Sequence, residues 1–359
     1  MNLPHEVYIA ATATRLPRLF QPEESVNALY PSAAGDLAHR LALKMAKTIG
    51  IRHRPSVLDP ARWPERIRAR EEDHPVRWCA DLAQELGAAA GGPGALGHLS
   101  VAYNASSDPD VLPSVSARVA SRLGLDLERP PDERPFLGCA GALFSVQDAF
   151  QYCRQSQRAA VACAFDQCSW LVKAVSDTKA PDFGDHLRTS LIFGDGAAGL
   201  LLVPAALRDR LRGPAARLVD VRTGFIPGGS VRMEGGHLLL GKELKDEMPE
   251  AVSKRLVLPM LERRGLRPGD VDEWSIHQGG LPILSRFAAP EALGLSEEAL
   301  APSRELFLEY GNFSAPSCLF VLDRFFRLAA AGARRPGRRG VVVSFGAGYY
   351  LGAMLYEWA

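Results

Sequence analysis

The chain has 359 residues, of which 47% are hydrophobic, and its 42 Lys and Arg side chains nearly balance 41 Asp and Glu, for a net charge of +1. A chain of this length and composition can bury one large core or two fused ones. The balanced charge provides no basic field for nucleic acid or an anionic membrane, and no apolar stretch reaches the length of a membrane span.

The six cysteines form no CxxC pair and have no companion histidine at the spacing of zinc ligands, so we expect no metal site. Several of them stand in apolar runs, as free buried thiols do in a reducing compartment. The first residues lack the charged and apolar regions of a signal peptide. The sequence therefore predicts a soluble, cytoplasmic protein.

The first half of the sequence alternates apolar runs, which predict strands, with segments of helical periodicity. We expect strands at 7–14, 99–103 and 159–165, and helices at 33–49, 74–86, 115–123 and 141–154. Residues 15–30, which hold two prolines, and the polar residues 166–189 are predicted to be irregular.

Basic side chains gather after the helix predicted at 33–49. They are Arg52, His53, Arg54, Arg62, Arg66, Arg68 and Arg70. A charge run of this kind is usually a solvated face. The alternative is a docking rim for coenzyme A or for the phosphopantetheine arm of a carrier protein. The sequence alone leaves both interpretations open.

The stretch around Cys139 is the first that suggests chemistry. In Gly138-Cys139-Ala140-Gly141 a cysteine stands between small residues, where an extended segment meets a predicted helix. Unpaired N–H groups and the helix dipole at such a position stabilise a thiolate. A single cysteine is more often a buried structural residue, so a catalytic interpretation depends on partners further along the chain.

The second half of the sequence repeats the alternation of strands and helices. A glycine-punctuated bend at 193–199 leads into the apolar strand that closes the first half. Further strands are predicted at 218–224, 273–276, 340–344 and 349–356, and helices at 242–264, 281–289, 303–308 and 315–328.

Two polar residues of this half stand in turns of small residues. His277 follows the strand at 273–276, and Asn312 precedes the helix at 315–328. Together with Cys139 they would supply a nucleophile, a base and a polar donor. Each has a structural alternative, since His277 could be a satisfied core histidine and Asn312 a helix cap.

The two halves have equally spaced landmarks. His277 lies 173 residues after Asn104, and both follow predicted strands; Asn312 lies 173 residues after Cys139, and both precede predicted helices. Equal offsets at independent landmarks indicate a duplicated unit, with halves at 1–205 and 206–359. Two such units packed about a pseudo-twofold axis would bring the thiol, the asparagine and the histidine together.

Five motifs give the chain a resemblance to thiolase-fold condensing enzymes, in the branch of ketoacyl-acyl-carrier-protein synthase III and the chalcone-synthase-like type III polyketide synthases. The motifs lie at 138–141, 193–198, 274–280, 309–315 and 345–348. Two positions depart from the chalcone-synthase-like pattern, because Gln278 and Ala347 stand where those enzymes usually have proline. The motifs are specific for the fold and the triad but not for a substrate.

The resemblance implies an α/β thiolase-like fold, in which two duplicated αβαβα-type halves form a five-layered core. It also implies that Cys139 is the nucleophile, since a thiolate both attacks and leaves a thioester readily. His277 and the Asn312 amide would then donate hydrogen bonds to a malonyl thioester as it becomes an enolate. The implied substrates are acyl-CoA or acyl-carrier-protein thioesters, with no metal or redox cofactor.

Three further residues follow from the resemblance as substrate-binding positions: Phe193, Gly346 and Gly348. Phe193 would be a gatekeeper aromatic, although an aromatic residue in an apolar strand is more often part of a core. The Cys139 amide and the 346–348 loop are candidate oxyanion donors. Leu240 stands where plant-type enzymes often have a second gatekeeper phenylalanine. A homodimer is implied, paired through the strand at 159–165.

The resulting prediction is an acyltransferase that condenses acyl thioesters by a Claisen reaction in polyketide or specialised fatty-acid-derived metabolism. One alternative retains the acyl-enzyme but transfers its acyl group to a hydroxyl or amine, or joins two carrier-bound chains without decarboxylation. A second alternative is a non-catalytic partner subunit. Such subunits usually lose the cysteine or the histidine, whereas this chain has both.

Overall fold

The computed structural model describes residues 6–31, 36–59, 70–171, 177–208, 210–211, 213–228, 231–234, 237–241, 244–333, 336–346 and 350–359, and for 231–240 the backbone alone. Nine of the described strands form one sheet in the order β5-β4-β6-β7-β1-β8-β13-β12-β11. Their bounds are β1 Val7–Arg15, β4 Leu96–Tyr103, β5 Asp132–Pro135, β6 Ala159–Gln167, β7 Asp195–Pro204, β8 Ala216–Phe225, β11 Glu273–Ile276, β12 Arg339–Phe345 and β13 Tyr350–Trp358.

The sheet consists of two halves with the same topology. They meet where β1 pairs with β8 through three residue pairs. Outward from this joint, β7, β6 and β4 follow β1 in the order and relative directions in which β13, β12 and β11 follow β8. This repetition confirms the predicted α/β fold of two duplicated halves, while the boundary at residue 205 stays a prediction.

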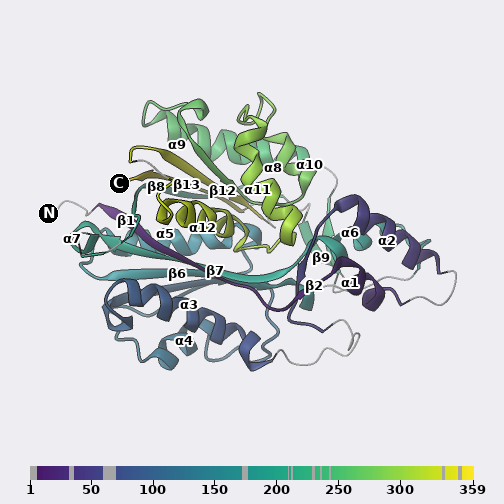
Figure 1. Cartoon of the computed structure of the whole chain (residues 1–359), viewed down its shortest axis with the longest axis horizontal. Helices are drawn as coiled ribbons and strands as arrows, with labels where there is room; N and C mark the ends of the chain where they lie inside the picture. Colours follow the sequence, from purple (N-terminus) through teal and green to yellow (C-terminus); the bar gives the residue numbers. More distant parts are fainter. Residues whose placement is uncertain are drawn as a thin grey trace.

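Eight of the described helices lie in three layers around the two halves of the sheet (Figure 1). Helices α5 (Gly141–Cys153) and α12 (Ser317–Ala330) lie between the halves. Helices α3 (Pro75–Ala89) and α4 (Val115–Leu123) cover the outer face of the first half. The second half is covered by α8 (Leu244–Val252), α9 (Leu258–Glu262), α10 (Leu281–Arg286) and α11 (Glu297–Tyr310). The five layers match the prediction.

The central layer explains why the sequence of α5 is apolar around most of its circumference. A helix with a sheet on either side needs no solvated face. Leu143, Val146 and Ala149 of α5 are fully buried in the core that also holds α12. At Gly352 of β13 the helix comes so close that an added Cβ would lie 2.8 Å from the Leu143 Cβ. This contact fixes the nucleophile helix against the sheet.

Two helices occur where the sequence predicted irregular structure. Helix α1 (Pro22–Leu29) begins at one of the prolines that suggested a loop, and proline is favourable at the first helical position. Helix α6 (Phe183–Ile192) lies mostly in the segment predicted as a polar loop. Its buried side chains Phe183, Leu187 and Leu191 recur every four residues and pack against α1 and α2 (Leu37–Ile49). The sequence contains this four-residue spacing, but the residues between the apolar positions are mostly polar, so the helix was not predicted.

The long helix predicted at 242–264 is interrupted. Helix α8 leads into a π-helical turn at Ser253–Val257, and α9 follows. Pro259 has no N–H to close the α-helical bond to the carbonyl four residues earlier, which favours a wider turn just before it. Residues 242–243 lie outside the described residues.

The predicted dimer contact through 159–165 is wrong. Strand β6, which contains these residues, pairs with β7 on one side and β4 on the other, so neither edge is open to a second chain. The outermost strands of the described sheet are β5 and β11. A contact through strand edges would therefore use one of these two.

Candidate active site

Cys139 lies in a single 3-10 turn, Gly138–Ala140, between β5 and α5. Gly138 has a φ of +57°, in the left-handed region that favours glycine, and it turns the chain from the strand into the helix. From the other half, Gly346 packs directly on this turn, and an added Cβ there would overlap the backbone N of Cys139. Ser344 donates a hydrogen bond to the Cys139 carbonyl. The nucleophile turn is thus held from both halves.

His277 follows β11, whose four residues are all buried. Its backbone N–H donates to the Val343 carbonyl at 2.9 Å, and its ring meets Phe345 edge-on, with ring centres 5.3 Å apart. The Nδ1 atom has no hydrogen-bond partner among the described residues. Burial lowers the pKa of His277 to about 3, so the imidazole is neutral at neutral pH.

Asn312 is held by its neighbours in a way that orients its side chain. Its backbone N–H donates to the Ile192 carbonyl at 2.8 Å. Its Oδ1 accepts hydrogen bonds from the Ser314 backbone N–H at 2.7 Å and from the Ser317 hydroxyl at 3.2 Å. Because the amide oxygen is occupied in this way, the NH₂ group of Asn312 is the part left for a ligand.

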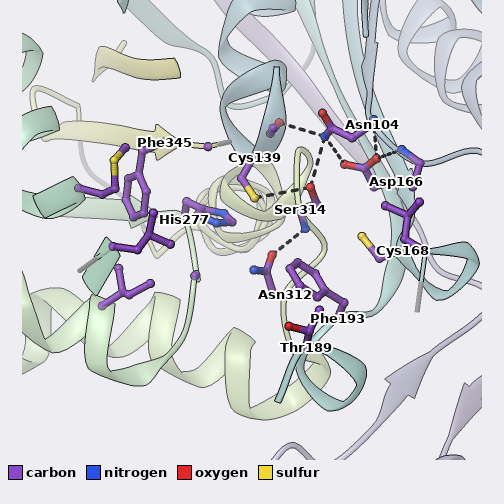
Figure 2. A pocket seen from close by; sticks show the side chains of 18 of the residues that line it. Asn104, Cys139, Asp166, Cys168, Thr189, Phe193, His277, Asn312, Ser314 and Phe345 are labelled. Atoms are coloured by element: carbon purple, nitrogen blue, oxygen red, sulfur yellow. Dashed lines mark hydrogen bonds between the residues drawn. The ribbon is translucent and has the colours of Figure 1, made fainter. Parts of the chain in front are cut away.

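One cavity of about 320 Å³ brings together the residues predicted from widely separated motifs (Figure 2). Cys139, His277 and Asn312 line it, and so do Phe193 and Gly346. Phe193 pairs with Asn312 in a short parallel bridge, and its carbonyl accepts from Arg54 Nε at 3.1 Å. Gly348 and the side chain of Leu240 lie outside the described residues.

The Cys139 thiol has a hydrogen-bond partner that was not predicted from the sequence. The Cys139 sulfur lies 3.5 Å from the Ser314 hydroxyl (Figure 2). The Asn104 side-chain amide donates to Ser314 Oγ at 3.3 Å and to Asp166 Oδ2 at 2.8 Å. Asp166 also accepts the backbone N–H groups of 104, 105 and 315. A network from both halves therefore reaches the thiol.

Asp166 could have been identified from the sequence. It is the one charged residue in the mostly apolar run at 159–167, which forms β6. Burial raises its pKa, and the four hydrogen-bond donors act against that rise. Ser314 left no comparable signal, since serine is ordinary in a turn. Its contact with the thiol follows from the tertiary packing of the two halves.

The thiolate expected from the helix N-terminus stays a prediction, because burial of the site acts against it. Burial raises the pKa of Cys139 to about 12, and the hydrogen bond from Ser314 offsets this only in part. Burial alone therefore favours a protonated thiol beside a neutral imidazole. This pair differs from the thiolate–imidazolium pair that a strongly activated cysteine would form.

A second cavity, of about 360 Å³, adjoins the first and shares with it the lining residues Leu244, Gly279 and Ile283. Arg188 and Lys245 also line it. The basic segment considered as a docking rim is described only in part. Arg54 is buried, Arg52 forms an ion pair with Glu309, and residues 60–69 lie outside the described residues.

Two other kinds of site were searched for in the described part of the chain. It contains no group of three or more His, Cys, Asp or Glu side chains placed to hold a metal ion. None of the helices described is both long enough and apolar enough to cross a membrane.

Comparison with known proteins shows the family to which this chain is related. The model for the C-terminal domain of chalcone and stilbene synthases matches residues 218–357. The chain is 30% identical over 298 residues to bisdemethoxycurcumin synthase of Oryza sativa subsp. japonica, covering 77% of this chain and 69% of that protein. It is 28% identical over 312 residues to an alpha-pyrone synthesis polyketide synthase-like protein of Mycobacterium tuberculosis, covering 82% and 75%.

Solved structures agree with this fold. The 1,3,6,8-tetrahydroxynaphthalene synthase of Streptomyces coelicolor superposes with a TM-score of 0.80 at 21% identity, covering 98% of this chain and 99% of that one. PKS-I of the brown alga Ectocarpus siliculosus gives 0.78 at 20% identity over the whole of both chains. The chain belongs to the type III polyketide synthase family of thiolase-like condensing enzymes, and it is an acyltransferase that joins acyl-CoA and malonyl-CoA by a cysteine-dependent Claisen condensation.

Proposed function

We propose that Cys139, His277 and Asn312 carry out this condensation as one catalytic set, with Phe193, Gly346 and Gly348 forming part of the substrate-binding wall. The observation that carries the proposal is the shared cavity, whose three polar groups come from turns at the ends of β5, β11 and α11. The arrangement supplies a nucleophile, a neutral base and an uncharged donor.

In the loading step, the neutral imidazole of His277 accepts the proton of the Cys139 thiol. The sulfur attacks the carbonyl of an acyl-CoA thioester, and the coenzyme A thiolate leaves and takes the proton back. The product is an S-acyl Cys139. Because the pKa of Cys139 is raised to about 12, proton transfer must accompany attack rather than precede it in the free enzyme.

In the condensation step, malonyl-CoA loses carbon dioxide and leaves an enolate on its thioester. The NH₂ group of Asn312 and an N–H of His277 donate to the enolate oxygen. The enolate carbon attacks the acyl carbonyl, a carbon–carbon bond forms, and the bond to the Cys139 sulfur breaks. The sulfur leaves as a thiolate, which takes a proton from water and becomes the thiol again. The Cys139 amide and the 346–348 loop stay the candidate oxyanion donors; in that loop the Gly346 N–H already donates to the Tyr350 carbonyl at 2.9 Å, and residues 347–348 lie outside the described residues.

Arg188 and Lys245 support coenzyme A thioesters as the substrates. They line the adjoining cavity, and Arg188 is also ion-paired with Asp185 at 2.6 Å; their positive charges suit the phosphates of a coenzyme A whose arm points toward Cys139. Replacing both with glutamate is expected to raise the KM for acyl-CoA. In the same assay, the acyl group attached to a carrier protein is tested as the alternative donor.

A homodimer is the proposed assembly. Among the described residues, the large apolar side chains of Val111, Leu112 and Phe136 are the most exposed, at 79%, 84% and 72%. Phe136 directly follows β5, which forms one edge of the described sheet. Exposed apolar side chains beside an open strand edge favour contact with a second copy. Analytical ultracentrifugation should show a dimer, which Leu112→Ser weakens.

A cytoplasmic location is the proposed one, because the six cysteines are free thiols, as is usual in a reducing compartment.

The function is tested by incubating the protein with acyl-CoA and malonyl-CoA. We expect a ketoacyl product, with one carbon dioxide released for each new carbon–carbon bond, and no product from Cys139→Ala. Turnover without carbon dioxide release would point to acyl transfer or to non-decarboxylative joining. A product from Cys139→Ala at the wild-type rate would exclude the proposed nucleophile.

A further inference from the structure

The hydroxyl of Thr189 is buried and has no hydrogen-bond partner in the described part of the protein. Thr189 lies on α6, is 6% exposed and lines the cavity that contains Cys139. Its Oγ1 has no hydrogen-bond partner among the described residues. In the view of Figure 2, Thr189 and Phe193 lie across the cavity from Cys139, with Asn312 between them.

The neighbouring residue shows that this helix can satisfy a buried hydroxyl. Ser190 is 1% exposed, donates to the Leu187 carbonyl at 2.8 Å and lies 2.9 Å from the Tyr30 hydroxyl. A helical threonine ordinarily bonds to a carbonyl one turn earlier in the same way. Thr189 does not, and an unpartnered buried hydroxyl disfavours the folded state. This loss of stability is expected at a binding site, where a ligand supplies the missing hydrogen-bond partner.

The surroundings of Thr189 define the chemistry of that ligand. Its cavity neighbours are mostly apolar, among them Phe193, Leu244 and Met248. No Lys or Arg is among the described residues that line this cavity, and its one carboxylate, Asp166, is already occupied by four donors. The group that reaches Thr189 is therefore uncharged and brings a hydrogen-bond acceptor into an apolar space.

We propose that the Thr189 hydroxyl donates a hydrogen bond to a ketone oxygen of the chain that grows on Cys139. This inference rests on the proposed function, because decarboxylative condensation is the step that creates such an oxygen. A saturated acyl group has no acceptor beyond its thioester carbonyl, whereas each condensation adds a carbonyl two carbons further along. Thr189 thus favours extended chains over the saturated starter, and it is a specificity-determining residue.

The test compares Thr189→Val, which keeps the shape and removes the hydroxyl, with Thr189→Ser, which restores it. Ser190→Ala is the matched control, since it removes an equally buried hydroxyl that is satisfied inside the protein. Hexanoyl-CoA and 3-oxooctanoyl-CoA serve as primers with malonyl-CoA, and kcat/KM is measured for each. Wild-type turnover of hexanoyl-CoA in the same series shows separately whether the proposed function holds.

For Thr189→Val we expect the preference for the 3-oxo primer over the saturated one to fall about three- to tenfold, the size of one neutral hydrogen bond. Thr189→Ser should return it to within about twofold of wild type. The melting temperature of free Thr189→Val should be equal to or above that of wild type, because valine has no hydroxyl to desolvate. Ser190→Ala should melt lower and keep the primer preference.

Two results would overturn the inference. In the first, Thr189→Val loses activity equally with both primers, which would mean that the hydroxyl does not recognise the ketone. In the second, Thr189→Val melts well below wild type and keeps the primer preference, which would mean that the hydroxyl supports the fold. Either result is compatible with normal turnover of hexanoyl-CoA by the wild type, so the proposed function would survive it.

Discussion

The ionisation of Cys139 can be followed directly by alkylation. Since burial raises its pKa to about 12, the thiolate fraction should grow roughly tenfold for each pH unit across the accessible range. We expect the rate of iodoacetamide labelling at Cys139, read by peptide mass spectrometry, to keep rising through pH 9 without a plateau. An inflection between pH 5 and 7 would instead reveal a thiolate–imidazolium pair.

Asn312→Asp separates the two steps of the proposed reaction. Aspartate retains the oxygen that accepts from Ser314 and Ser317, so the turn should stay folded, but it replaces the NH₂ donor with a second acceptor. Stabilisation of the enolate is lost, and carbon dioxide release from malonyl-CoA should fall by about 10²- to 10³-fold. Carbon dioxide release at the wild-type rate would remove Asn312 from the mechanism.

At the residue scale, Cys139, His277, Asn312 and Phe193 could be predicted because each stands in a short motif at the end of an element. Ser314 and Thr189 could not, because their contacts depend on how distant segments pack. The protonation state of Cys139 also could not be predicted from the sequence. A helix N-terminus lowers a thiol pKa and burial raises it, and the extent of burial is visible only in the structure.

At the scale of elements, the close packing of β12 on the nucleophile turn makes a testable prediction. In Gly346→Ala the new Cβ would overlap the Cys139 backbone N, so the turn must shift. Displacement of the nucleophile by even about 1 Å should lower acylation by about 10²-fold. Rates of acyl-enzyme formation by intact-protein mass spectrometry measure the effect.

The matched control for this change is Gly269→Ala, where an added Cβ meets nothing within 4 Å. It should load acyl groups at the wild-type rate. Equal rates for Gly346→Ala and Gly269→Ala would show that the contact between β12 and the turn does not position Cys139.

The elements that could be predicted are those with one dominant pattern. The largely apolar runs of β4 and β6, the periodic helix α4 and the short strand β11 appear within a few residues of their expected bounds. Helix α6 was missed because its apolar residues form a narrow stripe, and this stripe packs on two small helices rather than on the sheet. The π-helical turn before Pro259 depends on local backbone geometry that periodicity does not encode.

At the scale of the whole molecule, duplication explains how the site forms. The two helices of the central layer, α5 and α12, are equivalent in the two halves, and each is preceded by a turn that carries one residue of the proposed catalytic set. The equal offset of 173 residues predicted this meeting. The sequence misplaced the dimer contact, because strand order within the sheet, which decides which edges are free, is not visible in strand periodicity.

Buried thiols make the stability of the whole fold sensitive to alkaline pH. Cys79, Cys153, Cys163, Cys168 and Cys318 are buried, and burial raises the pKa of each. Above a pH of about 8.5 the unfolded chain releases these protons and the folded protein keeps them, so the free energy of unfolding falls as pH rises. Each thiol contributes up to about 1.4 kcal/mol per pH unit.

Denaturant unfolding between pH 8 and 10 measures this dependence. Cys79→Ala should have a shallower slope than wild type, because it removes one of the five groups. A free energy of unfolding that stays constant over this range, or an unchanged slope in Cys79→Ala, would contradict the account of these buried thiols.

The most direct measurement is a single-turnover chase on the intact protein. Wild-type enzyme and Asn312→Asp are first loaded with a saturated acyl-CoA, then mixed with malonyl-CoA, and the mass on Cys139 is followed with time. The account predicts acylation of Cys139 in both proteins and consumption of the acyl group by condensation in the wild type alone. It would be contradicted by acylation at another residue, or by Asn312→Asp consuming its acyl group as fast as the wild type.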